Sequence, residues 1–208
     1  MRPVETDALT ITFDARTCIH ARRCVLGLPG VFRPGARGGW IQPGDADPEA
    51  LVRVIEACPS GALSYTHKQG AEEPTPEVNT ARLWENGPVE LRGEIVIGEE
   101  SYTRVTLCRC GKSANKPFCD NSHIEAGFTA TSEPAANEEA APLEARNGPL
   151  NLRVAPNGPV IISGNLELIA GSGRALDTTE KLYLCRCGAS GNKPYCDGSH
   201  KEAGFTTE

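Results

Sequence analysis

Two stretches of the chain repeat one another and decide how it folds: residues 108–123 read CRCGKSANKPFCDNSH, and residues 185–200 read CRCGASGNKPYCDGSH. Each stretch carries three cysteines and one histidine at the same offsets. These residues are Cys108, Cys110, Cys119 and His123 in the first copy, and Cys185, Cys187, Cys196 and His200 in the second. Thiolates and imidazole nitrogens are common protein ligands of zinc and iron. The sequence therefore predicts two equivalent metal sites.

The spacing of these residues predicts how each set shares its metal. Residues two apart in an extended segment point to the same side, so Cys108 and Cys110 can bind one iron. Residues four apart share one face of a helix, so Cys119 and His123 can bind a second iron. The Asp-Asn-Ser and Asp-Gly-Ser tripeptides favour the start of a helix and would bring backbone donors near the sulfurs. Two irons with two protein ligands each describe a 2Fe-2S cluster.

The repeat extends beyond the ligands and predicts a framework of strands. The first copy covers residues 86–129 and the second covers residues 157–206, and both begin with Asn-Gly-Pro, a turn signal, followed by apolar runs. We expect short antiparallel strands, with those of residues 147–169 pairing with those of residues 87–97. Residues 131–146 contain TSEPAANEEAAP, which has little to bury and predicts a linker.

The repeated pattern resembles that of the CDGSH iron–sulfur family, the mitoNEET-like proteins, which share C-x-C-x2-(S/T)-x3-P-x-C-D-G-(S/A/T)-H. The second copy matches at every position, and the first differs only at Asn121, where the pattern has glycine. Asparagine tolerates the left-handed backbone region, so we expect the fold to persist. The resemblance implies a redox-active 2Fe-2S cluster in each copy, ligated by three Cys and one His and near solvent at its histidine edge. It further implies that the two copies form a pseudo-dimer under a shared β-rich cap, which makes the chain a monomer with internal pseudo-two-fold symmetry.

The other three cysteines, Cys18, Cys24 and Cys58, lie within residues 1–66. A Cys-x5-Cys segment followed by a distant Cys-Pro resembles single-cluster bacterial ferredoxins in a divergent form. The resemblance implies that these three thiols ligate a further iron–sulfur cluster. Small buried thiols without a ligand role are the alternative, since free cysteine is common in protein cores.

Two cluster types are compatible with this N-terminal group. Ala21 stands where the four-cysteine ferredoxins carry another cysteine, so three thiolates suit a 3Fe-4S cluster. His20 lies in the same segment and is the alternative fourth ligand, which would complete a 4Fe-4S cluster. The sequence favours 3Fe-4S and leaves 4Fe-4S open.

The expected fold class is α+β, in three parts. A small ferredoxin-like domain of two helices on a short sheet occupies residues 1–66, and a linker follows at residues 67–80. The first CDGSH module covers residues 81–130, and the second covers residues 147–208, after the linker at residues 131–146.

Three elements are expected in the N-terminal domain. Residues 8–13, ALTITF, predict a strand, and Cys18–Leu28 predicts a short helix or ordered turn. Residues 47–59 predict a second helix, since Asp47 can cap it and Pro48 suits its first position.

Charge and composition narrow the partners. The formal net charge of -6 argues against a nucleic-acid partner, and an acidic carrier would dock on a basic patch of a partner protein. No apolar run approaches membrane-spanning length, and the first residues lack a secretory pattern. We therefore expect a cytoplasmic protein that does not act at a membrane. In such a reducing compartment its nine cysteines would bind metal rather than form disulfides.

Three functions are compatible with these residues. The sequence shows no GxGxxG loop and no distinct nucleophile or paired-carboxylate site, so we expect a non-enzyme, a soluble one-electron carrier serving a redox partner protein. Protonated imidazole cannot bind iron, so the alternative is an acid-labile cluster donor to an apo-acceptor protein, or a redox sensor. The third is a structural zinc-binding module, since Cys3His is an ordinary zinc ligand set.

Overall fold

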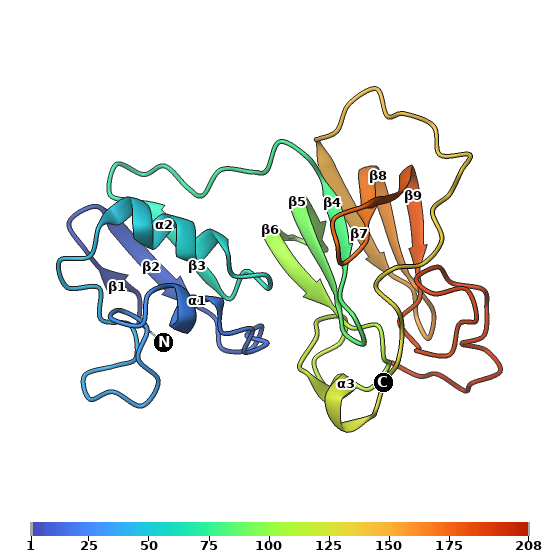
Figure 1. The fold of residues 1–208 in the computed structure, drawn as a ribbon, viewed down its shortest axis with the longest axis horizontal. Helices are drawn as coiled ribbons and strands as arrows, with labels where there is room; N and C mark the ends of the chain where they lie inside the picture. Colours follow the sequence, from blue (N-terminus) through green and yellow to red (C-terminus); the bar gives the residue numbers. More distant parts are fainter. Residues whose placement is uncertain (1, 208) are drawn as a thin grey trace. The chain divides into compact units, whose positions relative to one another are not determined.

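The computed structural model describes residues 2–207, and the chain divides into two compact units, Met1–Pro74 and Thr75–Glu208 (Figure 1). Both expected CDGSH modules, residues 81–130 and 147–208, fall within the second unit. Over residues 2–207, every helix is too short or too polar to cross a membrane.

The first unit is a three-stranded antiparallel sheet, in the order β1-β2-β3, with two helices. Its elements are β1 (Val4–Glu5), β2 (Leu9–Phe13), α1 (Arg23–Gly27), α2 (Pro48–Glu56) and β3 (Leu63–His67). The predicted strand and both predicted helices are therefore present. Leu9 and Ile11 of β2 pack with Leu51 and Ile55 of α2 in the core of this unit.

The start of α2 follows the predicted capping chemistry. The backbone N–H of Ala50 donates to the Asp47 carboxylate at 3.0 Å, and Pro48 occupies the first helical position. Leu51 and Ile55 lie four residues apart, so they share one helical face and are both buried. The helix ends at Glu56, which places Cys58 just beyond it.

The second unit contains a six-stranded sheet and one short helix. Its elements are β4 (Thr80–Leu83), β5 (Val89–Ile97), β6 (Glu100–Leu107), α3 (Ser122–Glu125), β7 (Pro149–Val154), β8 (Val160–Ile169) and β9 (Ala175–Leu184). Each copy of the repeat contributes three strands joined as antiparallel hairpins, β4-β5-β6 and β7-β8-β9. An Asn-Gly-Pro turn connects the first two strands of each copy.

The two copies are joined by strand pairing, as predicted, but the direction of that pairing was predicted wrongly. Strand β5 pairs with β7, and β4 pairs with β8, and both pairings are parallel rather than antiparallel. The hairpins fix these directions: once β5 and β7 run parallel, their antiparallel partners β4 and β8 must also run parallel. The four strands consequently close into a ring, β4-β5-β7-β8, with β6 beside β5 and β9 beside β8.

Two glycines let the strands bend where they exchange partners. Gly93 in β5 and Gly164 in β8 have φ angles of 154° and 131° and lie at register shifts of their hairpins. A Cβ at Gly93 would collide with the Asn79 side chain, and one at Gly164 would collide with the Pro149 carbonyl. Inside the ring, apolar side chains of both copies form one core, which includes Leu83, Leu91, Ile95, Leu107, Leu150, Val160, Ile162, Leu168 and Leu184.

Candidate metal centres

A closed loop follows the last strand of each copy and carries the ligands. In the first copy the Cys108 N–H donates to the Pro117 carbonyl at 2.9 Å, and the Cys119 N–H donates to the Thr106 carbonyl at 2.9 Å. The second copy repeats these bonds from Cys185 to Pro194 at 2.9 Å and from Cys196 to Tyr183 at 2.8 Å. The peptide bonds before Pro117 and Pro194 are both cis. These main-chain bonds bring the third cysteine back beside the Cys-x-Cys pair.

The four predicted ligands of each copy approach one another in two pairs. The Cys108 and Cys110 sulfurs are 3.5 Å apart, and the Cys119 sulfur lies 3.6 Å from Nδ1 of His123. In the second copy the corresponding distances are 3.7 Å for Cys185–Cys187 and 3.5 Å for Cys196–His200. A tetrahedral metal with metal–sulfur bonds of about 2.3 Å separates its ligands by about 3.8 Å. Each pair is therefore spaced to share one metal.

The grouping of these ligands bears on which metal group fits. Among the residues described, no three His, Cys, Asp or Glu side chains are placed to hold one ion together. A structural zinc site gathers all four ligands around a single ion. A two-and-two arrangement instead suits a group with two metals, in which each pair of side chains holds one of them.

Backbone donors surround the thiols. The N–H groups of Lys112, Asn121 and Ala189 each point at a ligand sulfur at 3.4 Å, namely Cys110, Cys119 and Cys187 respectively. Such donors stabilise the negative charge of a thiolate. Within the first pair, the hydrogen bond from the Cys110 thiol, with help from nearby backbone N–H groups, holds the pKa of Cys108 well below its ordinary value.

The aspartate of each motif holds the loop rather than metal. Asp120 accepts hydrogen bonds from the Ala114 N–H at 2.8 Å and from the Ser122 N–H and hydroxyl at 3.0 and 2.7 Å. Burial would raise the pKa of Asp120, but these hydrogen bonds outweigh it and lower the pKa below its ordinary value. Asp197 makes the same three bonds in the second copy, which lower its pKa further.

The prediction that Cys119 and His123 share a helical face is wrong. Helix α3 begins only at Ser122, after Cys119, and Asn121 before it has a left-handed φ of 73°. This residue breaks the helical phase, and the resulting turn brings sulfur and imidazole together. Gly198 occupies the same place in the second copy with φ of 93°, so Asn121 adopts the left-handed conformation that was expected of it.

Each ligand histidine is partly buried, with its second ring nitrogen beside the Asn-Gly-Pro turn. A Cβ at Gly87 would lie 3.8 Å from Nε2 of His123, and a Cβ at Gly158 would lie 3.8 Å from Nε2 of His200. Burial lowers the pKa of His123, which favours the neutral imidazole that a metal requires. The turn that opens each copy of the repeat thus forms one wall of that copy's site.

Sequence reasoning missed the arginine that separates the first two cysteines of each copy. Arg109 donates from Nε to the Gly87 carbonyl at 2.8 Å and from Nη2 to the Trp84 carbonyl at 2.5 Å. Arg186 makes equivalent bonds to the carbonyls of Gly158 and Ala155, both at 2.6 Å. The signal was available, because the variable position of Cys-x-Cys is arginine in both copies.

A second missed feature is the contact between the two ligand loops. Gly111 and Gly188 have φ angles of 77° and 81°. A Cβ at Gly111 would lie 2.6 Å from the Cys187 carbonyl oxygen, and a Cβ at Gly188 would lie 2.7 Å from that of Cys110. The two candidate centres therefore meet backbone to backbone, and only glycine fits at the contact.

The N-terminal unit brings its own predicted ligands to one cavity of about 510 Å³. Cys18, Cys24, Cys58 and His20 all line it, together with aromatic and aliphatic side chains that include Phe13, Trp40 and Leu63. The three thiols are partly buried, and burial raises the pKa of Cys18 and Cys24. The cavity thus combines a set of soft donors with an apolar lining.

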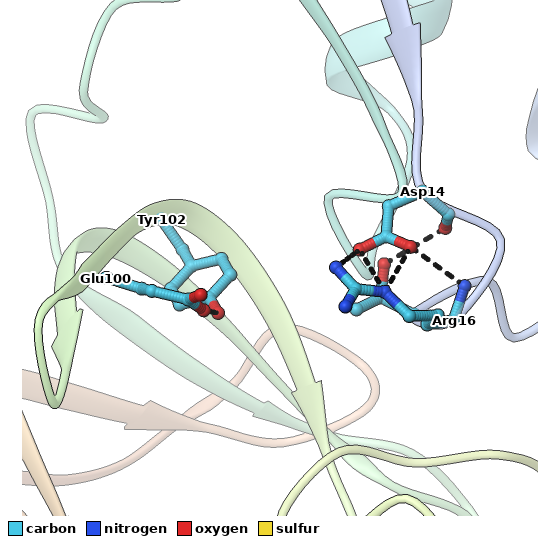
Figure 2. A network of polar contacts seen from close by, with 5 residues as sticks. Asp14, Arg16, Glu100 and Tyr102 are labelled. Atoms are coloured by element: carbon cyan, nitrogen blue, oxygen red, sulfur yellow. Dashed lines mark hydrogen bonds and ion pairs between the residues drawn. The ribbon is translucent and has the colours of Figure 1, made fainter. Parts of the chain in front are cut away.

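The chain enters this cavity through a turn that Asp14 organises. The Arg16 guanidinium faces both carboxylate oxygens of Asp14, at 3.0 Å from Nε and 2.8 Å from Nη2, as Figure 2 shows. Asp14 also donates its N–H to the Ala62 carbonyl at 2.8 Å. Beyond the turn, His20 adopts a left-handed φ of 51°, and its N–H hydrogen bonds to the Cys18 thiol.

Comparisons with known proteins agree with both sites. Residues 4–68 match a family model described as "Divergent 4Fe-4S mono-cluster", and residues 86–124 and 157–201 match one described as "Iron-binding zinc finger CDGSH type". Two curated relatives, each named "Uncharacterized protein YjdI", come from Escherichia coli strain K12 and Escherichia coli O157:H7. Each is 39% identical over 62 residues, which cover 30% of this chain and 80% of the relative.

The fold and the donor sets, taken with these matches, define a class of protein with iron–sulfur binding domains. The chain belongs to the CDGSH iron–sulfur family and carries a divergent mono-cluster domain ahead of its two CDGSH modules. The resemblance inferred from the sequence is confirmed.

Proposed function

We propose that the chain is a one-electron carrier, with a 2Fe-2S cluster in each CDGSH site and a third cluster in the N-terminal cavity. Bound 2Fe-2S groups supply one-electron redox chemistry. The chain's own residues would hold them: Cys108 and Cys110 on one metal and Cys119 and His123 on the other, with the same division in the second copy. We further propose that the protein is not an enzyme, and that its partner is another redox protein.

The observation that carries this proposal is the spacing of the ligand pairs, 3.5–3.7 Å, twice in the same unit. Paired ligands support a two-metal group over a single zinc ion in each site. The contact of Gly111 and Gly188 with the opposite loop adds a reason for carriage. It would place both redox groups close together, as a pseudo-dimer does, and so favour electron exchange between them.

Anaerobic purification followed by metal, sulfide and spectroscopic analysis tests the proposal. We expect coloured protein containing iron and inorganic sulfide, and an electron paramagnetic resonance signal that appears on reduction. A colourless protein that contains zinc and no sulfide would refute the proposal and support a structural zinc module. A partner assay completes the test: electron delivery to an oxidised acceptor protein should leave the iron content of this chain unchanged.

Cluster transfer is a second candidate function, and the partial exposure of His123 and His200 favours it. A half-exposed imidazole can be reached by protons, and its protonated form cannot hold iron. Incubation with an apo-ferredoxin separates the two functions. A transfer protein would lose iron and sulfide to the acceptor at a rate that rises as pH falls, whereas a carrier would deliver electrons alone.

For the N-terminal cavity, two observations support 4Fe-4S with His20 as the fourth ligand. His20 lines the cavity beside the three cysteines, and the family model that matches residues 4–68 is named for a 4Fe-4S cluster. A 3Fe-4S cluster remains the alternative for three thiolates. Replacing His20 with alanine tests this, since a 4Fe-4S centre should lose one iron and become paramagnetic when oxidised. An unchanged oxidised spectrum would show that His20 is not a ligand.

A further inference from the structure

Arg109 and Arg186 are unusually deeply buried for arginine. Each side chain is only 3% exposed, at equivalent places between the first two cysteines of its copy. Arginine is almost never so buried without a negative partner, because removing its charge from water is costly. The carbonyl groups that accept its hydrogen bonds are neutral. They fix the direction of each side chain but do not balance its charge.

The negative groups nearest to each arginine belong to the opposite copy. Burial lowers the pKa of Arg109 to about 10, and the charge of Cys185 opposes this shift most strongly. Burial lowers the pKa of Arg186 too, and there the opposing charge is that of Cys108. Each arginine is therefore anchored in its own copy and faces a ligand of the other.

The backbone explains this crossed arrangement. Gly111 follows Arg109 by two residues and abuts the carbonyl of Cys187, while Gly188 abuts the carbonyl of Cys110. Because the loops meet at these glycines, a side chain just before the contact reaches the neighbouring ligand set. Nη1 of Arg109 is buried and has no hydrogen-bond partner within residues 2–207. This donor is available to an acceptor that belongs to a bound group.

We propose that Arg109 and Arg186 each supply positive charge to the cluster of the opposite copy and raise its reduction potential. This inference rests on the proposed function, which places a cluster in each site. Reduction adds negative charge, so a fixed cation nearby favours the reduced form. The arrangement also couples the copies, because a residue of the first motif sets the potential of the second centre and vice versa.

The experiment needs the two centres to be distinguishable. Replacing His200 with cysteine gives the second centre four thiolate ligands, which should move its midpoint potential away from that of the first. His123→Cys marks the first centre in the same way. In each marked protein we would introduce Arg109→Met or Arg186→Met and follow a dye-mediated redox titration by visible absorption and electron paramagnetic resonance.

We expect Arg109→Met to move the midpoint of the Cys185–His200 centre to more negative potential, by more than it moves the first centre. Arg186→Met should produce the reverse pattern. A larger shift in the centre of the same copy, or no shift in either, would overturn the inference. Iron and sulfide content is measured first: if both are absent from the unmutated chain, the proposed function itself fails.

Arg109→Lys separates charge from scaffolding, and it serves if the methionine variant does not fold. Lysine retains the positive charge but cannot donate to two carbonyls as the guanidinium does. We expect a lower melting temperature with a midpoint close to that of the unmutated second centre. A purely structural role predicts instead that the midpoint and the melting temperature change together in the lysine variant, which would contradict the inference.

Discussion

The N-terminal cavity and the paired CDGSH sites hold the same kinds of ligand in different ways. In each CDGSH site the ligands lie within sixteen consecutive residues, and main-chain bonds close the loop around them. In the N-terminal unit, Cys18 and Cys24 follow β2, whereas Cys58 lies beyond α2. The CDGSH ligands are therefore positioned by local backbone, and the N-terminal ligands by packing of a whole unit.

This difference teaches where each site derives its stability. The CDGSH loops rest on a ring of strands whose core is formed by apolar side chains from both copies. The N-terminal thiols line a cavity of about 510 Å³ in a unit of only 74 residues. Small domains have thin cores and often depend on metal for stability. Loss of its cluster should consequently unfold the N-terminal unit, while the strand ring survives loss of its own.

The largest expected effect comes from removing one ligand at each kind of site. Cys58→Ser should abolish the N-terminal cluster and expose the backbone amides of β2 and α2 to rapid hydrogen exchange. Cys196→Ser should abolish the second CDGSH cluster, roughly half of the CDGSH iron, and leave the amides of β7 and β8 protected. Iron analysis and hydrogen exchange measured on the same samples check both results. Equal protection in the two variants would remove the contrast.

The next effect concerns the backbone contact between the CDGSH loops. Gly111→Ala imposes a left-handed alanine, at about 1–2 kcal/mol, and a clash with the Cys187 carbonyl, at roughly a further 1–3 kcal/mol. Gly98→Ala is the matched control, because Gly98 has φ of 65° and open space around it. Denaturant unfolding should show the larger loss for Gly111→Ala. Similar losses would mean that the loops separate at little cost.

The short-range part of these sites could be predicted from sequence, and the long-range part could not. The Cys-x-Cys spacing brought Cys108 and Cys110 together because two-residue periodicity is a local property of extended backbone. The same reasoning placed Cys119 and His123 on a helix and failed, since one left-handed residue changes the phase of the turn. Their proximity was correct, but its cause was not.

Ring closure and the crossed arginines depend on contacts between residues some seventy positions apart. The hydrophobic pattern of β5 and β7 identifies strands, but it does not state the direction in which strands of different copies pair. Arg109 reads as a variable position because its carbonyl acceptors lie in a turn more than twenty residues upstream. In the N-terminal unit the pattern of three cysteines identified the ligand group, whereas the lining of its cavity required the fold.

A smaller effect, in pH rather than in energy, compares the histidine ligands with the aspartates that hold the loops. Neutral imidazole binds metal, so ligation lowers the histidine pKa, and the stability it contributes is present above about pH 6.5 and lost as pH falls. The lowered pKa of Asp120 gives stability that is present above about pH 3.9 and lost below it. Replacing both His123 and His200 with cysteine should move the loss of visible colour from near pH 6.5 toward pH 4. Loss of colour at the same pH in both proteins would show that histidine is not the weak ligand.

The smallest effect tests whether backbone conformation alone sets the CDGSH sites. Asn121 and Gly198 hold the same left-handed position, with φ angles of 73° and 93°. Asn121→Gly relieves the cost of a side chain in that region but adds freedom to the unfolded chain, so we expect a net change of less than about 1 kcal/mol. Gly198→Ala, which lacks the tolerance of asparagine, should cost about 1–2 kcal/mol, whereas Gly198→Asn should cost less. Thermal unfolding measures these differences, and an equal cost for alanine and asparagine would show that the left-handed turn does not determine how sulfur and imidazole meet.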